Sequence, residues 1–392
     1  MNRRTLLGSL SASVLTTGFP CLIHADLLDD SSIDKFDKQI DQEFYKFDKE
    51  LEARFKAMDR AINEAFAEME RVLEKRWGGA AKLPSRTSWV GYDQRNDERV
   101  IADYENGKVA VEKQETTDEK TLSKALNDAL GMDSEALDKR DVVGQHVDKN
   151  ARQAGKDAIS GGGAARRNQK SELGKLVGDD AKPGHDIRTI RDPDGKTRKV
   201  GRAEVSMLPD HKRLSANLIA PVARKYAQRF EVDMALILSI MQNESSFNPR
   251  AQSPIPAFGL MQLVPSTGGT DAYRVVHNKK KAPSPDYLFH PDQNIELGCA
   301  YLQLLDSEYL KSVSDSESRK YCVISAYNTG AGNVSRAFTG NTNIASAAQQ
   351  INRMRPGEVH DHLLANLPAE ETKNYLRKVL RDEKRYLDYN AT

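Results

Sequence analysis

The side chain with the clearest potential for chemistry is that of Glu244, which follows a run of apolar residues from Met234 to Met241. That run is apolar on all sides and predicts a buried helix. At the C-terminus of a buried helix, the helix dipole and the loss of water both disfavour a carboxylate, so we expect a raised pKa for Glu244. A carboxylic acid that stays protonated near neutral pH can donate its proton to the leaving oxygen of a glycosidic bond. The alternative is a solvated glutamate at a helix end without function.

Motifs with fixed spacing begin at Glu244 and continue along the chain. They are, in order, E-S-x-F-N-P-x-A-x-S from Glu244 to Ser253, G-L-M-Q from Gly259 to Gln262, N-I-x-x-G-x-x-Y-L from Asn294 to Leu302, A-Y-N-x-G-x-G from Ala326 to Gly332, and E-T-x-x-Y from Glu371 to Tyr375. This ordered set resembles the lytic transglycosylase family over roughly residues 207–388. Within the family, the resemblance is greatest to the membrane-bound lytic murein transglycosylase C type, which also has an additional N-terminal domain.

The resemblance implies a lysozyme-like catalytic domain that acts on peptidoglycan and uses Glu244 as its only acid and base. Ordinary glycosidases need a second carboxylate to attack the sugar or to activate water. In the lytic transglycosylase reaction, the C6 hydroxyl of the sugar attacks its own anomeric carbon. Glu244 would therefore donate a proton to the leaving oxygen and then accept one from that hydroxyl, which leaves a 1,6-anhydromuramoyl end.

Two other functions are compatible with the same motifs. A water-using muramidase of the same fold would need another acid across the cleft, such as Asp271 or Asp292. A protein that keeps the cleft without turnover would act as a peptidoglycan-binding scaffold. The digestion products distinguish them, because a lytic transglycosylase leaves anhydro ends, a muramidase leaves reducing ends, and a scaffold leaves neither.

The resemblance also assigns roles to residues that line the expected cleft. The substrate-binding set is Ser253, Gln262, Tyr327, Asn328 and Tyr375, in which the two tyrosines are expected to place hydroxyls near Glu244. A serine in a turn, a glutamine that caps a helix and tyrosines bonded within the core are the structural alternatives. The residues expected to shape the cleft through their backbone are Gly259, Met261, Gly330 and Gly332. We expect the glycines to allow a positive φ or a close approach of the glycan.

The sequence implies neither a metal nor another cofactor. His360-x-His362 is the closest pair of histidines, and no third ligand accompanies it. Cys299 and Cys322 match no zinc or redox motif. In an oxidising compartment they either pair, joining two neighbouring helices, or remain as two buried free thiols.

A segment near the N-terminus predicts one long helix. Four copies of an 11-residue unit place apolar residues at steps of 4, 4 and 3 from Phe36 to Trp77, and the helix is expected to end at Gly78-Gly79. Such a helix is about 60 Å long and is expected to need another partner for part of its apolar stripe. Its polar face carries 11 acids and 9 bases, so residues 36–77 predict self-association or an envelope protein partner rather than a membrane surface. The alternative is a helix that folds back along its own domain, which a break near Ala57 or Ala65 would favour.

The remaining sequence divides into a mixed region and a helical region. Glu105-Asn106-Gly107 separates two alternating segments and predicts a hairpin, a second hairpin is expected around Pro193-Asp194-Gly195, and residues 118–155 look helical. Consecutive helical patterns begin at about Met207. The predicted organisation is a signal peptide (1–25), a long helix (26–78), a small α+β domain with a flexible linker near 156–172 (79–206) and a mainly α, lysozyme-like catalytic domain (207–392). The predicted fold class is therefore α+β overall.

Composition and targeting features limit the location and the partners. The 392 residues carry a formal net charge of +1, which gives no reason to expect nucleic acid binding, and no internal apolar run is long enough to span a bilayer. Arg3-Arg4 before the weakly apolar run Leu6–Ile23 predicts export to the periplasm by a general secretory or twin-arginine signal, with a short core helix as the alternative. Phe19-Pro20 stands before Cys21, where a lipoprotein needs a small residue, so the sequence gives no support for a lipid anchor.

Overall fold

The computed structural model describes residues 30–155, 173–253 and 255–390. The predicted signal peptide and the predicted linker at 156–172 lie outside these residues. The chain divides into two compact units, residues 1–52 and 53–392. The mixed region and the helical region lie in the same second unit, so the predicted domain boundary at residue 207 remains a prediction.

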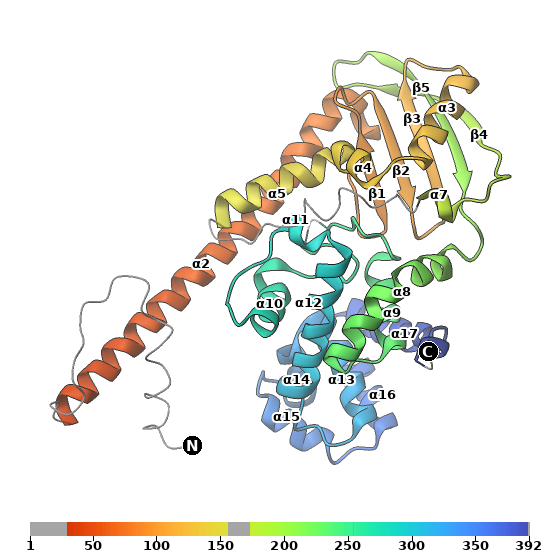
Figure 1. Ribbon diagram of the computed structural model, residues 1–392. Coiled ribbons are helices and arrows are strands. Elements are labelled where there is room, and N and C mark those ends of the chain that lie inside the picture. The colour runs from red at the N-terminus through yellow and green to blue at the C-terminus, as the bar shows by residue number, and fades with distance from the viewer. Residues whose placement is uncertain (1–29, 156–172, 254, 391–392) are drawn as a thin grey trace. The chain divides into compact units, whose positions relative to one another are not determined.

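The 11-residue repeat forms a single helix, α2 (Asp30–Trp77), which ends at η2 (Gly78–Ala80) (Figure 1). Within the second unit, the apolar stripe of α2 faces the core, and its buried members are Met58, Ile62, Ala65, Phe66, Met69, Leu73 and Trp77. The helix continues through Ala57 and Ala65 without a break. From Met58 onward, the stripe therefore packs along its own unit, as the alternative of a helix that follows its own domain expects. Self-association or an envelope protein partner through residues 36–77 remains a prediction.

Five antiparallel strands form one sheet in the order β1-β2-β3-β5-β4. Their bounds are β1 (Ser88–Tyr92), β2 (Glu98–Asp103), β3 (Lys108–Gln114), β4 (Gly184–Arg191) and β5 (Thr197–Ser206). Both predicted hairpins are present: Gly107 takes φ +64° between β2 and β3, and Gly195 takes φ +81° between β4 and β5. These are backbone conformations that glycine adopts without the cost other residues incur.

Helices cover both faces of the sheet because the strand residues alternate between the two faces. Val90, Tyr92 and Ile101 share a core with the end of α2. Val100 and Val111 lie on the opposite face and pack with α3 (Glu119–Leu130). The predicted helical region 118–155 contains α3, α4 (Ser134–Arg140) and α5 (Val142–Gly155), and α7 (Leu173–Leu176) follows the linker.

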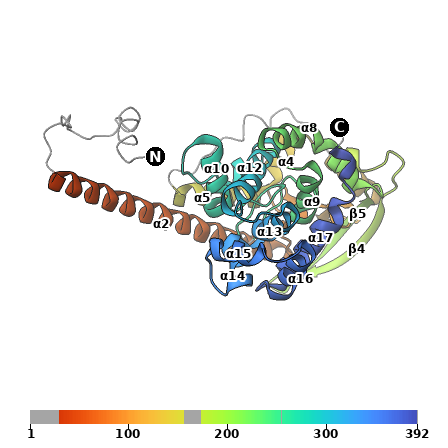
Figure 2. The same cartoon turned by 90° about the horizontal axis from the view of Figure 1, so that it is seen from below.

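The rest of the unit is helical. Its buried helix, α9 (Met234–Ser245), packs against α8 (His211–Phe230) and α17 (Glu370–Glu383) (Figure 2). The other elements are η3 (Pro265–Gly269), α10 (Thr270–His277), α11 (Pro285–Leu288), α12 (Pro291–Leu304), η4 (Leu305–Tyr309), α13 (Ser316–Thr329), α14 (Ala331–Thr339), α15 (Ile344–Ile351), α16 (Pro356–Asn366) and η5 (Leu387–Tyr389). The long helix, the small sheet and the helical C-terminal region confirm the predicted α+β class. None of the described helices is long and apolar enough to cross a bilayer.

The two cysteines of the helical region are free. Cys299 lies on α12 and Cys322 on α13, and both are buried. The structure therefore agrees with two buried thiols and not with the disulfide. Both thiols stay protonated near neutral pH because burial raises the pKa of each, to about 12 in the case of Cys322.

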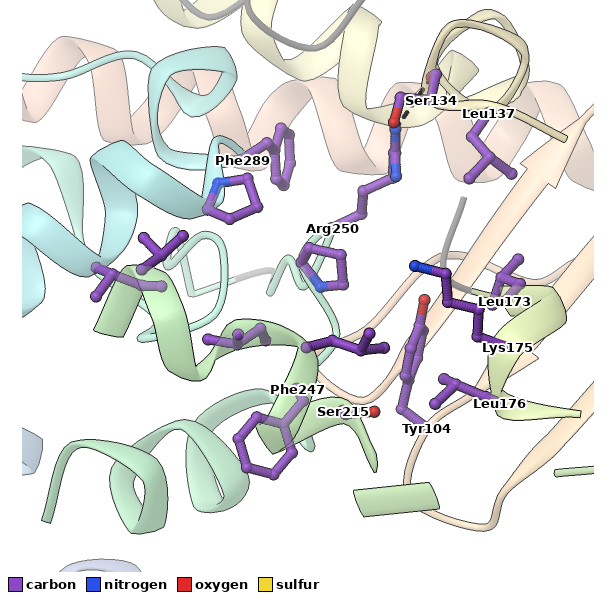
Figure 3. Close-up of a pocket in the computed structure, with 16 residues that line it drawn as sticks. Tyr104, Ser134, Leu137, Leu173, Lys175, Leu176, Ser215, Phe247, Arg250 and Phe289 are labelled. Atoms are coloured by element: carbon purple, nitrogen blue, oxygen red, sulfur yellow. Dashed lines mark hydrogen bonds between the residues drawn. The ribbon is translucent and has the colours of Figure 1, made fainter. Parts of the chain in front are cut away.

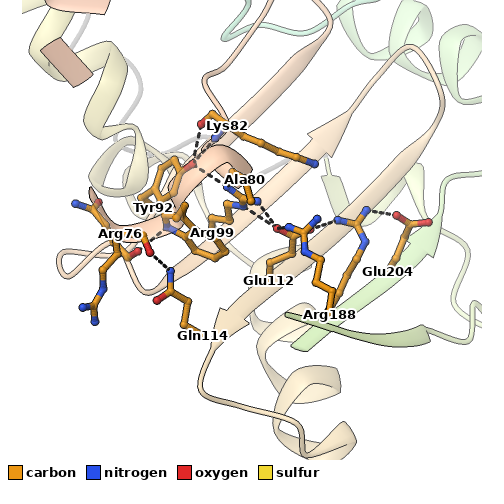
Figure 4. A network of polar contacts seen from close by, with 12 residues as sticks. Arg76, Ala80, Lys82, Tyr92, Arg99, Glu112, Gln114, Arg188 and Glu204 are labelled. Atoms are coloured by element: carbon orange, nitrogen blue, oxygen red, sulfur yellow. Dashed lines mark hydrogen bonds and ion pairs between the residues drawn. The ribbon is translucent and has the colours of Figure 1, made fainter. Parts of the chain in front are cut away.

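A buried polar network fixes the segment between α2 and β1 to the sheet (Figure 4). Arg99 is fully buried, lies 3.9 Å above the Trp77 ring, and donates hydrogen bonds to the Ala80 carbonyl oxygen at 2.8 Å and to the Glu112 carboxylate at 2.8 Å. The Tyr92 hydroxyl donates to the Lys82 carbonyl oxygen at 2.7 Å. Burial alone would raise the pKa of Glu112, but the neighbouring arginine charges outweigh it and hold that pKa low. The segment between α2 and β1 is therefore held against the sheet at Ala80 and Lys82.

Candidate functional site

Glu244 lies in the last turn of α9. Asp233 caps the start of the helix, because its side chain accepts a hydrogen bond from the Leu236 N–H at 2.9 Å. The residues from Met234 to Met241 are apolar except Ser239, and nearly the whole helix is buried. It ends at Ser246, which adopts a left-handed conformation with φ +51° and donates its N–H to the Gln242 carbonyl oxygen. The Glu244 side chain is only 7% exposed. The predicted end of the buried helix is therefore where the structure places this carboxyl.

Burial raises the pKa of Glu244 to about 7. The Tyr375 hydroxyl and the positive charge of Arg86 act in the opposite direction, and the negative charge of Glu371 raises the pKa further. Burial is the largest of these causes, since a carboxylate loses more hydration than a carboxylic acid does. Glu244 is consequently protonated in a substantial fraction of molecules at neutral pH.

Tyr327 and Tyr375 both act on Glu244 but are bonded differently. The Tyr327 hydroxyl donates a hydrogen bond to the Met261 carbonyl oxygen at 2.8 Å. The Tyr375 hydroxyl is buried beside the Glu244 carboxyl and acts on it as a hydrogen-bond donor, although their contact does not have the geometry of an ordinary hydrogen bond. Burial first, and then the charge of Glu244, keep the pKa of each hydroxyl well above its ordinary value. Both hydroxyls therefore stay protonated near neutral pH and can donate hydrogen bonds.

The G-L-M-Q turn lies beside the end of α9 and is held from several sides. Gly259 has φ +77°, and a Cβ there would lie 2.2 Å from the Leu288 carbonyl oxygen, so the turn has no room for a side chain. Asn294 accepts a hydrogen bond from the Met261 N–H at 2.8 Å. The Ser245 hydroxyl donates to the Leu260 carbonyl oxygen at 2.8 Å. This clamp fixes the turn relative to Glu244.

Gln262 ends the turn with one polar atom unpaired. Its Nε2 donates hydrogen bonds to the carbonyl oxygens of Gly259 at 3.0 Å and Ala251 at 3.2 Å. Its Oε1 is buried and has no partner among the described residues. A buried acceptor without a partner is rare in folded proteins and is a natural position for a ligand donor.

The backbone around the site is strained at three residues other than glycine. Ser246, Phe247 and Gln262 have φ values of +51°, +65° and +47°. Such conformations are costly and concentrate at functional sites, where the surrounding structure enforces them. The first two redirect the chain directly after Glu244.

The remaining predicted residues occupy different positions around the site. Ser253 is half-buried next to Gln252, which forms an isolated bridge with Phe258. Asn328 accepts a hydrogen bond from the Thr372 hydroxyl at 2.7 Å, which joins α13 to α17. Gly330 follows α13 with φ +84°. Gly332 does not have a positive φ. A Cβ there would make only an ordinary contact with Thr342, so neither the backbone conformation nor the space requires glycine at this position.

Two charged residues beside Glu244 were not predicted as site residues. Nη1 of Arg86 lies 4.0 Å from Oε2 of Glu244 and 3.9 Å from Oε1 of Glu371. Arg86 belongs to the segment between α2 and β1, and no sequence motif marks it. Glu371 lies in the E-T-x-x-Y motif, in which only Tyr375 was predicted to have a role.

Gln252 is a third residue that the sequence did not single out. Its side chain is fully buried, and both Oε1 and Nε2 lack a partner among the described residues. It occurs within the first motif, where only Ser253 was expected to bind. An unpaired buried amide next to that serine is the feature that a sequence cannot display.

Comparisons with known proteins find relatives for both regions of the chain. Residues 221–350 match the family described as Transglycosylase SLT domain, and residues 55–156 match the family described as Membrane-bound lytic murein transglycosylase C, N-terminal domain. The membrane-bound lytic murein transglycosylase C of Haemophilus influenzae (strain PittEE) is 32% identical over 328 residues, which cover 80% of this chain and 86% of that protein. This chain belongs to the membrane-bound lytic murein transglycosylase C family. The resemblance that the motifs indicated is thus confirmed.

Two other members of the family match over a shorter range. The proteins of the same name from Photorhabdus laumondii and Yersinia pestis (strain Pestoides F) are 42% and 43% identical over 182 and 185 residues. Those alignments cover 46% and 47% of this chain, and in them the chain spans about half the length of these relatives, 50% and 51%. Among solved structures, the soluble lytic transglycosylase SLT70 of Escherichia coli is 24% identical with a TM-score of 0.34, over 43% of this chain and 24% of that one.

In this member of the membrane-bound lytic murein transglycosylase C family, the acid beside Glu244 is neither of the two that a muramidase was expected to use. Asp292 accepts a hydrogen bond from the Tyr226 hydroxyl at 2.6 Å and is 52% exposed. Asp271 lies on α10, where burial raises its pKa and Arg274 opposes that effect. The structure instead places Glu371 next to Glu244 through their shared contact with Arg86.

A cavity of about 280 Å³ lies behind the loop that follows Glu244 (Figure 3). Tyr104 of the sheet region, Leu176 of α7 and Phe247 contribute to its lining, whereas Glu244 does not. Arg250 crosses to α4, where it donates hydrogen bonds to the Ser134 carbonyl oxygen at 3.2 Å and to Asp138 at 2.6 Å. Because Glu244 does not line it, this cavity is not the place where that carboxyl would act.

Proposed function

We propose that this protein is a peptidoglycan lytic transglycosylase that cleaves the β-1,4 bond between MurNAc and GlcNAc and forms 1,6-anhydro-MurNAc ends. The observation that carries this proposal is the carboxyl of Glu244, which is 7% exposed and has a pKa of about 7. The family supports it, since the relatives are named lytic murein transglycosylases. The substrate class follows from those names, and the role of Glu244 as the only acid and base follows from the motif that it opens.

The proposed reaction uses one carboxyl in two steps. Glu244 donates its proton to the glycosidic oxygen while the bond from that oxygen to the anomeric carbon of MurNAc breaks. The C6 hydroxyl oxygen of the same sugar then bonds to the anomeric carbon, and its proton passes to the Glu244 carboxylate. The acid is regenerated, no water is consumed, and the total charge is conserved.

Unpaired polar atoms near Glu244 are suited to hold the sugar. The Tyr375 hydroxyl can donate a hydrogen bond, and Oε1 of Gln262 can accept one from an N-acetyl N–H or a hydroxyl. Ser253 and Asn328 are proposed to contribute further contacts. The backbones of Met261, Gly259 and Gly330 are proposed to shape the substrate cleft. For Gly332, only its place in the A-Y-N-x-G-x-G motif supports the same role.

The test is mass spectrometry of purified peptidoglycan digested with the full chain. Anhydro-muropeptides are expected from the wild type. The cleavage rate of Glu244→Gln should be lower by about a hundredfold to ten-thousandfold, because the substitution removes only the proton transfer. Residual activity of the variant above a tenth of wild type would place the acid elsewhere. Binding without turnover by both proteins would instead indicate a scaffold.

The second candidate is a water-using muramidase. The position of Glu371 makes it a better candidate for the second acid of such an enzyme than Asp271 or Asp292. A carboxylate near the acid can activate water for attack on the anomeric carbon. Digestion in water enriched with oxygen-18 separates the two functions. A muramidase places the heavy oxygen at new reducing ends, and Glu371→Gln stops that reaction, whereas a lytic transglycosylase forms anhydro ends without the label in both proteins.

We further propose that the protein acts in the periplasm, because its substrate lies in the envelope and its relatives are named membrane-bound. The basic and apolar residues at the start of the sequence support export. Fractionation of cells, with and without residues 1–25, tests this location. Recovery of the full chain in the cytoplasm would contradict it.

A further inference from the structure

We propose that Arg86 is a positioning residue of this active site, whose guanidinium balances the charge of Glu244 while that carboxyl loses and regains its proton. The proposal rests on the proposed function, because it concerns proton transfer by Glu244. It adds a group from outside the helical region to a site that the motifs confine to that region. The consequence is that the sheet region supplies part of the catalytic environment.

The backbone around Arg86 is anchored on both sides of the side chain. The Asn248 side-chain amide donates a hydrogen bond to the Arg86 carbonyl oxygen at 3.3 Å, and the Gln252 N–H donates to the Ser85 carbonyl oxygen at 3.3 Å. On the sheet side, the Tyr104 N–H donates to the Thr87 carbonyl oxygen at 2.9 Å. The first two donors belong to the motif that begins with Glu244. The segment therefore follows the active-site loop rather than moving independently of it.

The upstream end of the same segment is held by the buried network of the sheet. Arg99 holds the Ala80 carbonyl oxygen and Tyr92 holds that of Lys82, as Figure 4 shows. Only a few residues separate these anchors from Arg86. A short tether of this kind limits the region that the guanidinium can reach, which is a requirement for a group that must act at a fixed point.

The charged and titratable groups that face Glu244 come from three elements. Tyr375 and Glu371 lie on α17, Tyr327 lies on α13, and Arg86 lies on the segment before β1. Arg86 supplies the positive charge and Glu371 the negative one. Nη1 of Arg86 lies at nearly equal distances from the carboxyls of Glu244, at 4.0 Å, and Glu371, at 3.9 Å.

This geometry gives Arg86 a different partner in each protonation state. While Glu244 is a neutral acid, the guanidinium faces the carboxylate of Glu371, which is 72% exposed and well hydrated. When Glu244 has given its proton to the leaving oxygen, a negative charge appears in a buried position, and Arg86 stabilises it. Arg86 is itself 44% exposed, so water weakens the interaction and we expect a moderate effect.

The test is the pH profile of the cleavage rate, with Arg86→Gln, Arg86→Lys and Glu371→Gln compared with wild type. Activity needs protonated Glu244, so the rate falls as the pH rises through the pKa of that group. Removal of the positive charge disfavours the carboxylate, so Arg86→Gln should move this falling limb to higher pH by about half a unit to one unit. Removal of the negative charge has the opposite effect, so Glu371→Gln should move the limb to lower pH.

Two controls separate this charge effect from a structural one. Arg86→Lys keeps the charge and should leave the limb close to that of wild type. Arg95→Gln removes an arginine whose partner is Asp97, at 3.9 Å, and should not move the limb. Arg86→Gln should also slow cleavage at the optimum by about tenfold, but a loss of rate alone would not support the proposal, because misplacement of the loop would cause it as well.

The proposal is overturned if Arg86→Gln leaves the limb unmoved or shifts it to lower pH, or if Arg86→Lys shifts it as far as Arg86→Gln does. Should Arg86→Gln fail to fold, as judged by thermal melting, Arg86→Ala removes the same charge and decides the matter, and an unmoved limb then overturns the proposal. The proposed function fails by a different result. In that case the wild type forms no anhydro ends, or Glu244→Gln is as active as the wild type.

Discussion

Ser246, the first residue after the helix that carries Glu244, donates its hydroxyl hydrogen bond to the carboxylate of Glu105 in the β2–β3 turn. Glu105 also pairs with Lys212 of α8 at 2.9 Å. Burial alone would raise the pKa of Glu105, but the bonds from Ser246 and Lys212 outweigh it and lower that pKa. The hairpin of the sheet thus holds the left-handed residue that ends α9. The sheet region contacts the site through Glu105 as well as through Arg86.

A double-mutant cycle of Ser246→Ala and Glu105→Ala should show that these side chains stabilise each other. We expect a coupling of about 1 kcal/mol in the free energy of unfolding, because Glu105 is half exposed and water screens part of the bond. Each single variant should also lower the cleavage rate, since the strained turn after Glu244 loses its support. Urea unfolding measures the coupling. A coupling within experimental error of zero would show that the contact does not hold the turn.

The stability of Glu244→Gln should depend on pH in a defined way. In the wild type, the folded state keeps the Glu244 proton up to a pKa of about 7, whereas the unfolded chain releases it near its ordinary value of 4.5. Between these values the folded state binds more protons, so the stability of the wild type falls as the pH rises. The variant lacks this loss and should be more stable than wild type at pH 8, by at most about 3 kcal/mol.

Urea unfolding of both proteins at pH 4 and pH 8 measures this difference. At pH 4 the carboxyl is protonated in the folded and unfolded states, so the two proteins should differ little. Equal stability at both pH values would mean that the carboxyl is hydrated in the folded protein. The burial that supports its role as an acid would then be wrong.

The sequence located the chemistry of this protein better than it located the surroundings of that chemistry. Glu244, the G-L-M-Q turn and the two tyrosines stand in contiguous motifs, an apolar run indicated α9, and the 11-residue period indicated α2. Arg86 could not be found in this way, because it lies in an irregular segment and reaches Glu244 only through the packing of the sheet region. Periodicity likewise shows which face of α2 is apolar, but not what covers that face.

The two tyrosines near Glu244 should respond differently to loss of their hydroxyls. Tyr327→Phe leaves the buried Met261 carbonyl oxygen without its donor, so it should destabilise the fold by about 1 to 3 kcal/mol. Tyr375→Phe removes a hydroxyl that has no partner of good geometry, so it should leave stability unchanged or slightly raised while it lowers the cleavage rate. Urea unfolding and rate measurements on the same samples test both. If Tyr375→Phe were as active as wild type, its hydroxyl would not contact the substrate.

The buried stripe of α2 predicts a sharp contrast between two residues of the same helix. Ile62 is fully buried within the second unit, whereas Val72 is 40% exposed. Ile62→Asp places an unpaired charge in the core and should destabilise the fold by more than about 3 kcal/mol, while Val72→Asp should change stability by less than about 0.5 kcal/mol. Thermal unfolding of the full chain measures both effects. A small, equal effect would mean that the stripe is free for another partner after all. The expected contrast means that charges at Ile62 unfold the chain and cannot be used to probe self-association, for which exposed positions of α2 are required.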